Sequence, residues 1–185
     1  GRNMNGTEGA IITKFPDQKV LYCDILELEP CNHSLVGNKG LKFVLCMLFQ
    51  HTDADDEPIY HEGYARILPD KRGDTVCRFI NDFVSTRSYM LPDVLWCDKG
   101  CENVNKDILA MTRRLNIKQF LTPTASSQSN GVIENFNRLI RQGIAAVAAD
   151  KGVKQSAVHD YIPLVVEHVN ESYQVSKLGD EWSRK

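Results

Sequence analysis

Apolar and polar residues follow one another along the chain in blocks that predict strands first and helices later. Three apolar runs, at 19–28, 41–49 and 59–68, have the length and the residue types of strands. The second, LKFVLCMLF, is almost continuously apolar, which is typical of a strand buried on both faces. A polar stretch at 51–58 separates the second run from the third, and this predicts an antiparallel hairpin.

From residue 74 onward the periodicity becomes that of helices separated by short strands. Behind Asp74, which we expect to cap a helix, apolar residues recur at the helical spacing of three and four. The order of elements predicts an α/β fold whose sheet is antiparallel first and parallel later. The later patterns predict a strand at 93–97, a helix at 106–115, a strand at 119–121, a polar loop at 122–130, and helices at 131–149 and 158–173.

Length and composition indicate one domain with one hydrophobic core. The chain has 185 residues, of which 42% are hydrophobic. We expect a flexible N-terminal segment at 1–17, the core domain at 18–175 and a C-terminal tail at 176–185. The formal charge of -2, from 22 basic and 24 acidic residues, argues against a surface coated by nucleic acid but allows a local basic track. No apolar run approaches the roughly 18 residues of a membrane span.

Spacing excludes the familiar structural metal motifs. The six cysteines form no CxxC pair, and no histidine pair follows at zinc-finger distance, which favours a reduced, intracellular protein. Asp53 to Glu57 resembles the start of a calcium loop, but Pro58 stands where that loop needs glycine. We expect the histidines to lie at the surface (His33, His51 and His61) or at the edges of the last helix (His159 and His168).

Two aspartates follow aromatic-Cys pairs in apolar strands. LYCD ends at Asp24 and LWCD at Asp98, and polar residues at strand ends of α/β sheets face the crevice where ligands bind. Asp98 could equally cap a turn, because a glycine follows two residues later. Asp24 precedes more apolar residues, where a carboxylate is costly unless it is paired or binds metal. If the two strands are neighbours, the two carboxylates converge.

A third carboxylate, Glu134, lies in the first turns of the long helix predicted at 131–149. Glu134, Arg138 and Arg141 follow at i, i+4 and i+7, so they share one helix face, opposite the apolar one. Taken alone, this face is equally well a solvated one with an ordinary Glu–Arg pair.

The segments YCD, WCDKGCE and SQSNGVIENFNRLIR, with 35 residues between Asp98 and Glu134, together resemble the catalytic core of retroviral and LTR-retrotransposon integrases. The resemblance covers about residues 19–173. It implies a ribonuclease-H-like fold, with a five-stranded mixed sheet flanked by helices. It also implies that Asp24, Asp98 and Glu134 bind two Mg²⁺ or Mn²⁺ ions and act as a metal-dependent polynucleotidyl transferase. The implied reactions are 3′-end processing of retroelement DNA and strand transfer into target DNA.

The same resemblance implies DNA contacts and partners. Arg138 and Arg141 match basic positions that contact phosphates of element-end DNA, and Asn130 and Asn137 match positions that touch DNA or brace the site. The implied partners are the element ends, target DNA and further copies of the chain, as a homodimer or a higher homo-oligomer. No membrane is implied, and the protein would be nuclear if the element is eukaryotic.

Departures from the integrase pattern leave two alternatives open. Lys99 stands where integrases usually have asparagine, although all three carboxylates are present. One alternative is a DNA transposase of the same carboxylate-triad superfamily. The other is a domesticated integrase core that acts mainly as a DNA- or protein-binding module.

Overall fold

The computed structural model describes residues 18–51, 60–87, 91–98, 106–122 and 131–183. For residues 60, 98, 120–122 and 174–183 the description is confined to the backbone. The N-terminal segment, the acidic stretch at 53–57 and the polar loop at 123–130, which includes Asn130, lie outside the described residues.

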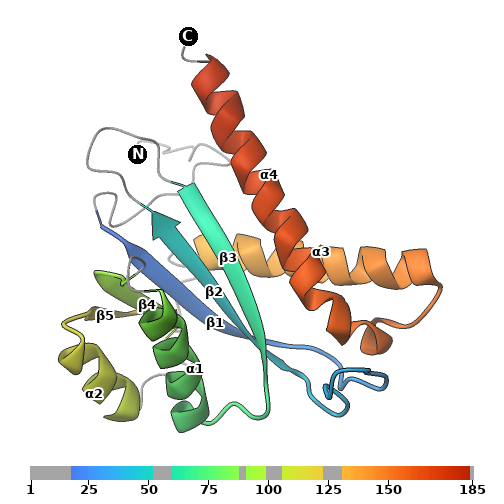
Figure 1. Cartoon of the computed structure of the whole chain (residues 1–185), viewed down its shortest axis with the longest axis horizontal. Helices are drawn as coiled ribbons and strands as arrows, with labels where there is room; N and C mark the ends of the chain where they lie inside the picture. The colour runs from blue at the N-terminus through green and yellow to red at the C-terminus, as the bar shows by residue number, and fades with distance from the viewer. Residues whose placement is uncertain (1–17, 52–59, 88–90, 99–105, 123–130, 184–185) are drawn as a thin grey trace, which may run out of the picture.

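Five strands form one mixed sheet with the order β3-β2-β1-β4-β5 (Figure 1). The first three strands pair antiparallel, and β4 and β5 join the other side of β1 in parallel. This confirms the predicted change from antiparallel to parallel pairing. The strands are β1 (Val20–Glu27), β2 (Phe43–His51), β3 (Tyr60–Leu68), β4 (Val94–Asp98) and β5 (Lys118–Thr122).

Helices cover both faces of the sheet. In Figure 1, α1 and α2 lie on one side of the strands and α3 and α4 on the other. Alternate residues of β1 explain the two layers, because Leu21 packs with α1 and α2 while Tyr22 packs with α3 and α4. The helices are α1 (Gly73–Thr86), α2 (Lys106–Arg114), α3 (Gly131–Lys151) and α4 (Ile162–Ser183), with short 3₁₀ turns at Gln155–Ala157 and His159–Tyr161 before α4.

Two predicted helix boundaries differ from the structure. Helix α1 begins at Gly73 with Arg72 at the N-cap, so Asp74 lies in the first turn and is not the cap. The last helix, predicted from residue 158, begins at Ile162 after the two 3₁₀ turns and continues to Ser183. Pro163 suits the first turn of α4, where its missing N–H needs no partner.

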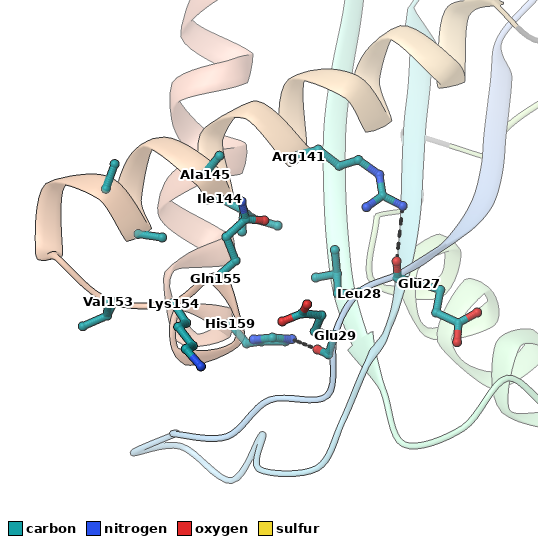
Figure 2. A pocket seen from close by; sticks show the side chains of 12 residues that line it. Glu27, Leu28, Glu29, Arg141, Ile144, Ala145, Val153, Lys154, Gln155 and His159 are labelled. Carbon is teal, nitrogen blue, oxygen red and sulfur yellow. Dashed lines mark hydrogen bonds between the residues drawn. The ribbon is translucent and has the colours of Figure 1, made fainter.

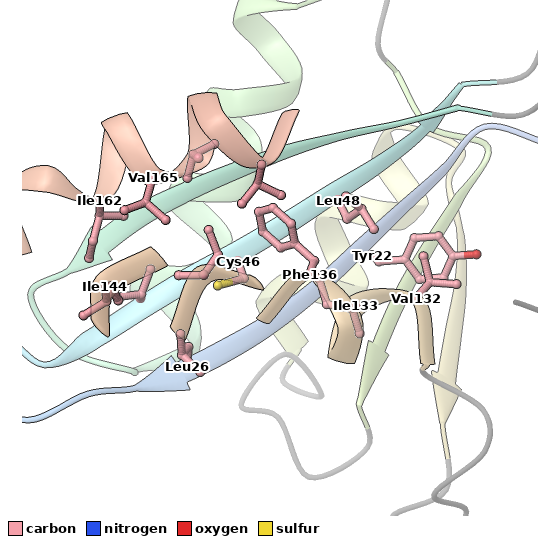
Figure 3. Close-up of a cluster of buried hydrophobic side chains, with 14 of the residues drawn as sticks. Tyr22, Leu26, Cys46, Leu48, Val132, Ile133, Phe136, Ile144, Ile162 and Val165 are labelled. Carbon is pink, nitrogen blue, oxygen red and sulfur yellow. The ribbon is translucent and has the colours of Figure 1, made fainter. Parts of the chain in front are cut away.

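The long helix α3 is held close to the sheet by its apolar face. Ile133, Phe136 and Ile140 are fully buried in the core between α3 and the strands, and Figure 3 shows the first two. Gly63 of β3 permits this approach, because a methyl group at that position would overlap the ring of Phe136. Packing therefore fixes the position of α3 over the sheet. The polar residues in the first turns of α3 are held in place with it. Within the described residues, no helix has both the length and the apolar character to cross a membrane.

Candidate active site

Asp24 and Asp98 lie on neighbouring parallel strands at the centre of the sheet. The last parallel pair between β1 and β4 joins Cys23 to Cys97, and each aspartate is the next residue along its strand. Neighbouring strands are about 4.8 Å apart. The backbones of the two aspartates therefore lie side by side, as expected if their strands are neighbours.

Asn137 links α3 to this position. Its side-chain Nδ2 donates a hydrogen bond of 2.8 Å to Oδ2 of Asp24, and only 9% of Asn137 is exposed. Glu134 precedes Asn137 by three residues, which is about 4.5 Å along the helix axis. The turn of α3 that carries Glu134 therefore lies next to the strand that carries Asp24, and the Glu134 side chain is exposed there.

The carboxylate of Asp24 is half-buried and held on both oxygens. Oδ1 accepts the backbone N–H of Ile25 at 2.9 Å, and Oδ2 accepts the bond from Asn137. Across the sheet, Asp24 stands opposite Cys46 of β2. Burial raises the pKa of the Cys46 thiol, the negative charge of Asp24 raises it further, and the positive charge of Arg141 lowers it. Asp24 and Arg141 thus both lie close enough to Cys46 for their charges to shift the pKa of its thiol.

The two arginines of α3 are exposed, as predicted, on the side that carries Glu134. Arg138 Nη2 donates to Oδ1 of Asn135 at 2.7 Å, and Arg141 Nη2 donates to the backbone oxygen of Glu27 at 3.2 Å. A guanidinium carries five N–H donors, and each of these bonds uses one. Asn137 is thus buried and braces Asp24, whereas the two arginines are exposed.

The donor set fits a hard divalent cation. Carboxylate oxygens are the ligands that Mg²⁺ and Mn²⁺ prefer. Asn137 Oδ1 is buried and, among the described residues, has no hydrogen-bond partner, so an acceptor stands open beside the Asp24 carboxylate. The described side chains contain no cluster of three His, Cys, Asp or Glu residues that could hold a metal, and the side chain of Asp98 is not among them.

The structure corrects the expected positions of two histidines and reveals a pocket that the sequence did not predict. His61 has its Nε2 atom buried, and His159 is 2% exposed in a 3₁₀ turn before α4. His159 lines a pocket next to Arg141 (Figure 2). In the sequence, the only traces of this pocket are the helical spacing of apolar residues in α3 and Glu29, just after β1. Neither pattern indicates a cavity.

Comparison with known proteins identifies the fold. No protein-family model and no curated protein sequence matches the chain. A chain in the cryo-EM structure of the simian T-cell lymphotropic virus intasome in complex with PP2A regulatory subunit B56 gamma matches with a TM-score of 0.61 and 11% identity, over 85% of this chain and 50% of that chain. The catalytic core domain of BIV integrase matches with a TM-score of 0.54 and 16% identity, over 88% of this chain and 97% of that domain.

These similarities define the class of fold. The chain has the α/β, ribonuclease-H-like fold of a retroviral integrase catalytic core, with five strands in one mixed sheet between helices. The resemblance read from the sequence is confirmed at this level. In extent, the chain corresponds to nearly all of the BIV core domain and spans about half the length of the matched intasome chain.

Proposed function

We propose that this chain is the catalytic core of an integrase-type enzyme, a metal-dependent polynucleotidyl transferase. It processes the 3′ ends of retroelement DNA and joins them to target DNA. The observation that carries the proposal is the 2.8 Å hydrogen bond from Asn137 to Asp24. That bond ties the turn of α3 bearing Glu134 to the strand bearing Asp24, whose neighbouring strand ends in Asp98.

In this proposal Asp24, Asp98 and Glu134 hold two Mg²⁺ or Mn²⁺ ions. Such a pair, when bound, activates the attacking oxygen and stabilises the leaving oxygen of an in-line phosphoryl displacement. The rigid strands β1 and β4 fix the backbones of the two aspartates, and the packing of Phe136 fixes α3. Such preorganisation is what a phosphoryl transfer site requires of the protein, since most of its catalysis is positioning and charge stabilisation.

Other residues of α3 have supporting roles. Asn137 holds Oδ2 of Asp24, so the carboxylate keeps one orientation when its charge is engaged. Arg138 and Arg141, exposed on the Glu134 side, bind phosphates of the element end and offset the local negative charge of the carboxylates and DNA.

The proposed partners are retroelement DNA ends, target DNA and further copies of the chain. Support comes from the fold, because one structure with the same fold is an intasome and another is an integrase core. The chain's formal charge of -2 fits a protein that engages DNA along one track rather than over its whole surface.

The test is a titration of Mn²⁺ into the wild-type chain, Asp98→Asn and Asp150→Asn, with labelled oligonucleotides that include a branched substrate for the reverse reaction. Asp150 is exposed at the far end of α3 and provides a matched change of charge. We expect metal-dependent joining in wild type and Asp150→Asn, and none in Asp98→Asn. Wild type that binds DNA but joins none at any Mn²⁺ concentration would contradict the proposal in favour of a binding module.

A further inference from the structure

A pocket of about 840 Å³ lies between the end of β1, the second half of α3 and the turn that leads to α4. Figure 2 shows side chains from all three segments around it. The pocket begins at Arg141 of α3. Arg141 follows Asn137, the residue that braces Asp24, by four residues, which is about 6 Å along the helix axis. A DNA strand that reaches the three carboxylates covers such a distance within about two nucleotides, at roughly 3.4 Å each.

One part of the pocket lining is apolar and shaped by small side chains. Ala145 and Ala148 line it from α3, beside Ile144, and Leu28 lines it from the end of β1. Because alanine projects only a methyl group, the helix leaves room here for a flat ring to lie against it. A nucleobase is such a ring, and its apolar faces leave water when it lies against these side chains.

The polar side chains of the pocket have separate places. Arg141 reaches from α3 toward the backbone oxygen of Glu27, while Glu29 lies next to His159 (Figure 2). His159 is buried, and its Nε2 bonds to the backbone oxygen of Glu29 at 2.9 Å. The main chain that carries the Glu29 carboxylate is therefore fixed, and a carboxylate accepts hydrogen bonds from exocyclic amino groups of bases.

We propose that this pocket is a nucleotide subsite, which receives one base unstacked from the DNA strand bound at the carboxylates. Arg141 binds the phosphate of that nucleotide, the apolar lining holds the base, and Glu29 accepts its exocyclic amino group. The ligand class is thus a nucleotide with adenine, cytosine or guanine. This inference rests on the proposed function, because that function brings the strand to α3.

The charges of the pocket favour this ligand over others. A free phosphate would bind Arg141 but would leave the apolar lining unused and would meet Glu29. Glu27 is already paired with Lys42 at 3.0 Å, so its charge opposes a phosphate at Arg141 less. An acidic peptide would find two cations in the lining, Arg141 and Lys154, but its carboxylates would offer no hydrogen-bond donor to Glu29. A nucleotide alone among these uses cation, apolar surface and acceptor together.

The experiment places 2-aminopurine, a fluorescent base with an exocyclic amino group, at successive positions of a branched oligonucleotide bound to the full chain. Unstacking of this base from its neighbours raises its fluorescence. The variants are Ala145→Leu, which fills the pocket, and Glu29→Ala, which removes the side-chain acceptor. Their matched controls are Ala146→Leu, the next residue on α3 and part of the lining between α3 and α4, and Glu167→Ala, at an exposed glutamate of α4.

We expect the fluorescence to rise at one position in wild type and both controls. The equilibrium constant for placing the base in the pocket, obtained from that rise, should fall at least about fivefold in both pocket variants. The absence of any position-specific rise, or an equal response of Ala145→Leu and Ala146→Leu, would overturn the inference. Strand joining measured on the same samples separates the two proposals. Joining without a position-specific rise refutes the pocket alone, and a rise without joining at any Mn²⁺ concentration refutes the enzymatic proposal alone.

Discussion

Asn137 on α3 and Asp24 on β1, 113 residues apart, are joined by a hydrogen bond of 2.8 Å from Nδ2 to Oδ2. The bond forms where α3 crosses the central strand, one helical turn after Glu134. It is the contact that brings the third carboxylate of the proposed site to the first.

Asn137→Ala is therefore expected to lower metal-dependent strand joining by about 10- to 100-fold, the usual effect of losing a residue that orients a metal ligand. Joining measured over a range of Mn²⁺ concentrations should show a higher metal requirement, because the Asp24 carboxylate loses its fixed orientation. Gln142→Ala, an exposed change on the same helix, should leave joining unchanged. An Asn137→Ala protein that joins strands as wild type does, at the same Mn²⁺ concentration, would remove Asn137 from the site.

Gly63 should tolerate no side chain. A methyl group there overlaps the buried ring of Phe136, so Gly63→Ala must displace α3 or the strand. We expect a loss of about 1–3 kcal/mol in the free energy of unfolding, measured by denaturant titration. At Gly131, the first residue of α3, an added methyl group meets no atom within 4 Å, so Gly131→Ala is the control and should change stability little. Equal stabilities for the two variants would show that α3 does not pack against β3 as described.

Stability should fall below neutral pH because of His61. Burial, aided by the charge of His51, lowers the pKa of His61 from 6.5 to about 4, so the folded protein holds this ring neutral. Between these values the unfolded chain binds the proton and the folded chain does not. His61 therefore leaves the free energy of unfolding undiminished above about pH 6.5. As the pH falls toward 4, proton binding by the unfolded chain lowers that free energy by up to about 3 kcal/mol.

The test compares unfolding free energies at pH 7.5 and 4.5 for His61→Phe and His168→Phe. His61 lies between the rings of Tyr22 and Tyr173, with centroids 6.4 Å from each, so phenylalanine suits the place. The pH dependence should flatten in His61→Phe and persist in His168→Phe, whose side chain is 71% exposed in the wild type. A dependence that is unchanged in His61→Phe would assign it to other groups.

Several strands were predictable from local pattern, because β2 is apolar along almost its whole length and β4 is an apolar run that ends at a polar residue. The resemblance to integrase cores implied a five-stranded mixed sheet, and the structure gives the order of its strands. The placement of Asp24 and Asp98 on neighbouring strands needed only the parallel pairing of β1 and β4. That part of the site is a consequence of topology.

Contacts between distant side chains were not predictable in the same way. The alternation of β3 allows His61 to face either solvent or core, and it is α4, packed across that strand, that buries the ring. His159 likewise depends on the backbone of Glu29, 130 residues away. The bracing role of Asn137 was one of two readings of its motif, and the geometry of the α3 crossing favours it over a direct DNA contact.

The most direct test of the central claim is the anomalous diffraction of Mn²⁺ in crystals of the chain soaked with manganese. The account predicts a pair of manganese peaks about 3.5–4 Å apart, ligated by the carboxylates of Asp24, Asp98 and Glu134. Manganese bound elsewhere, or Glu134 turned away from both aspartates in crystals that also contain DNA, would contradict it.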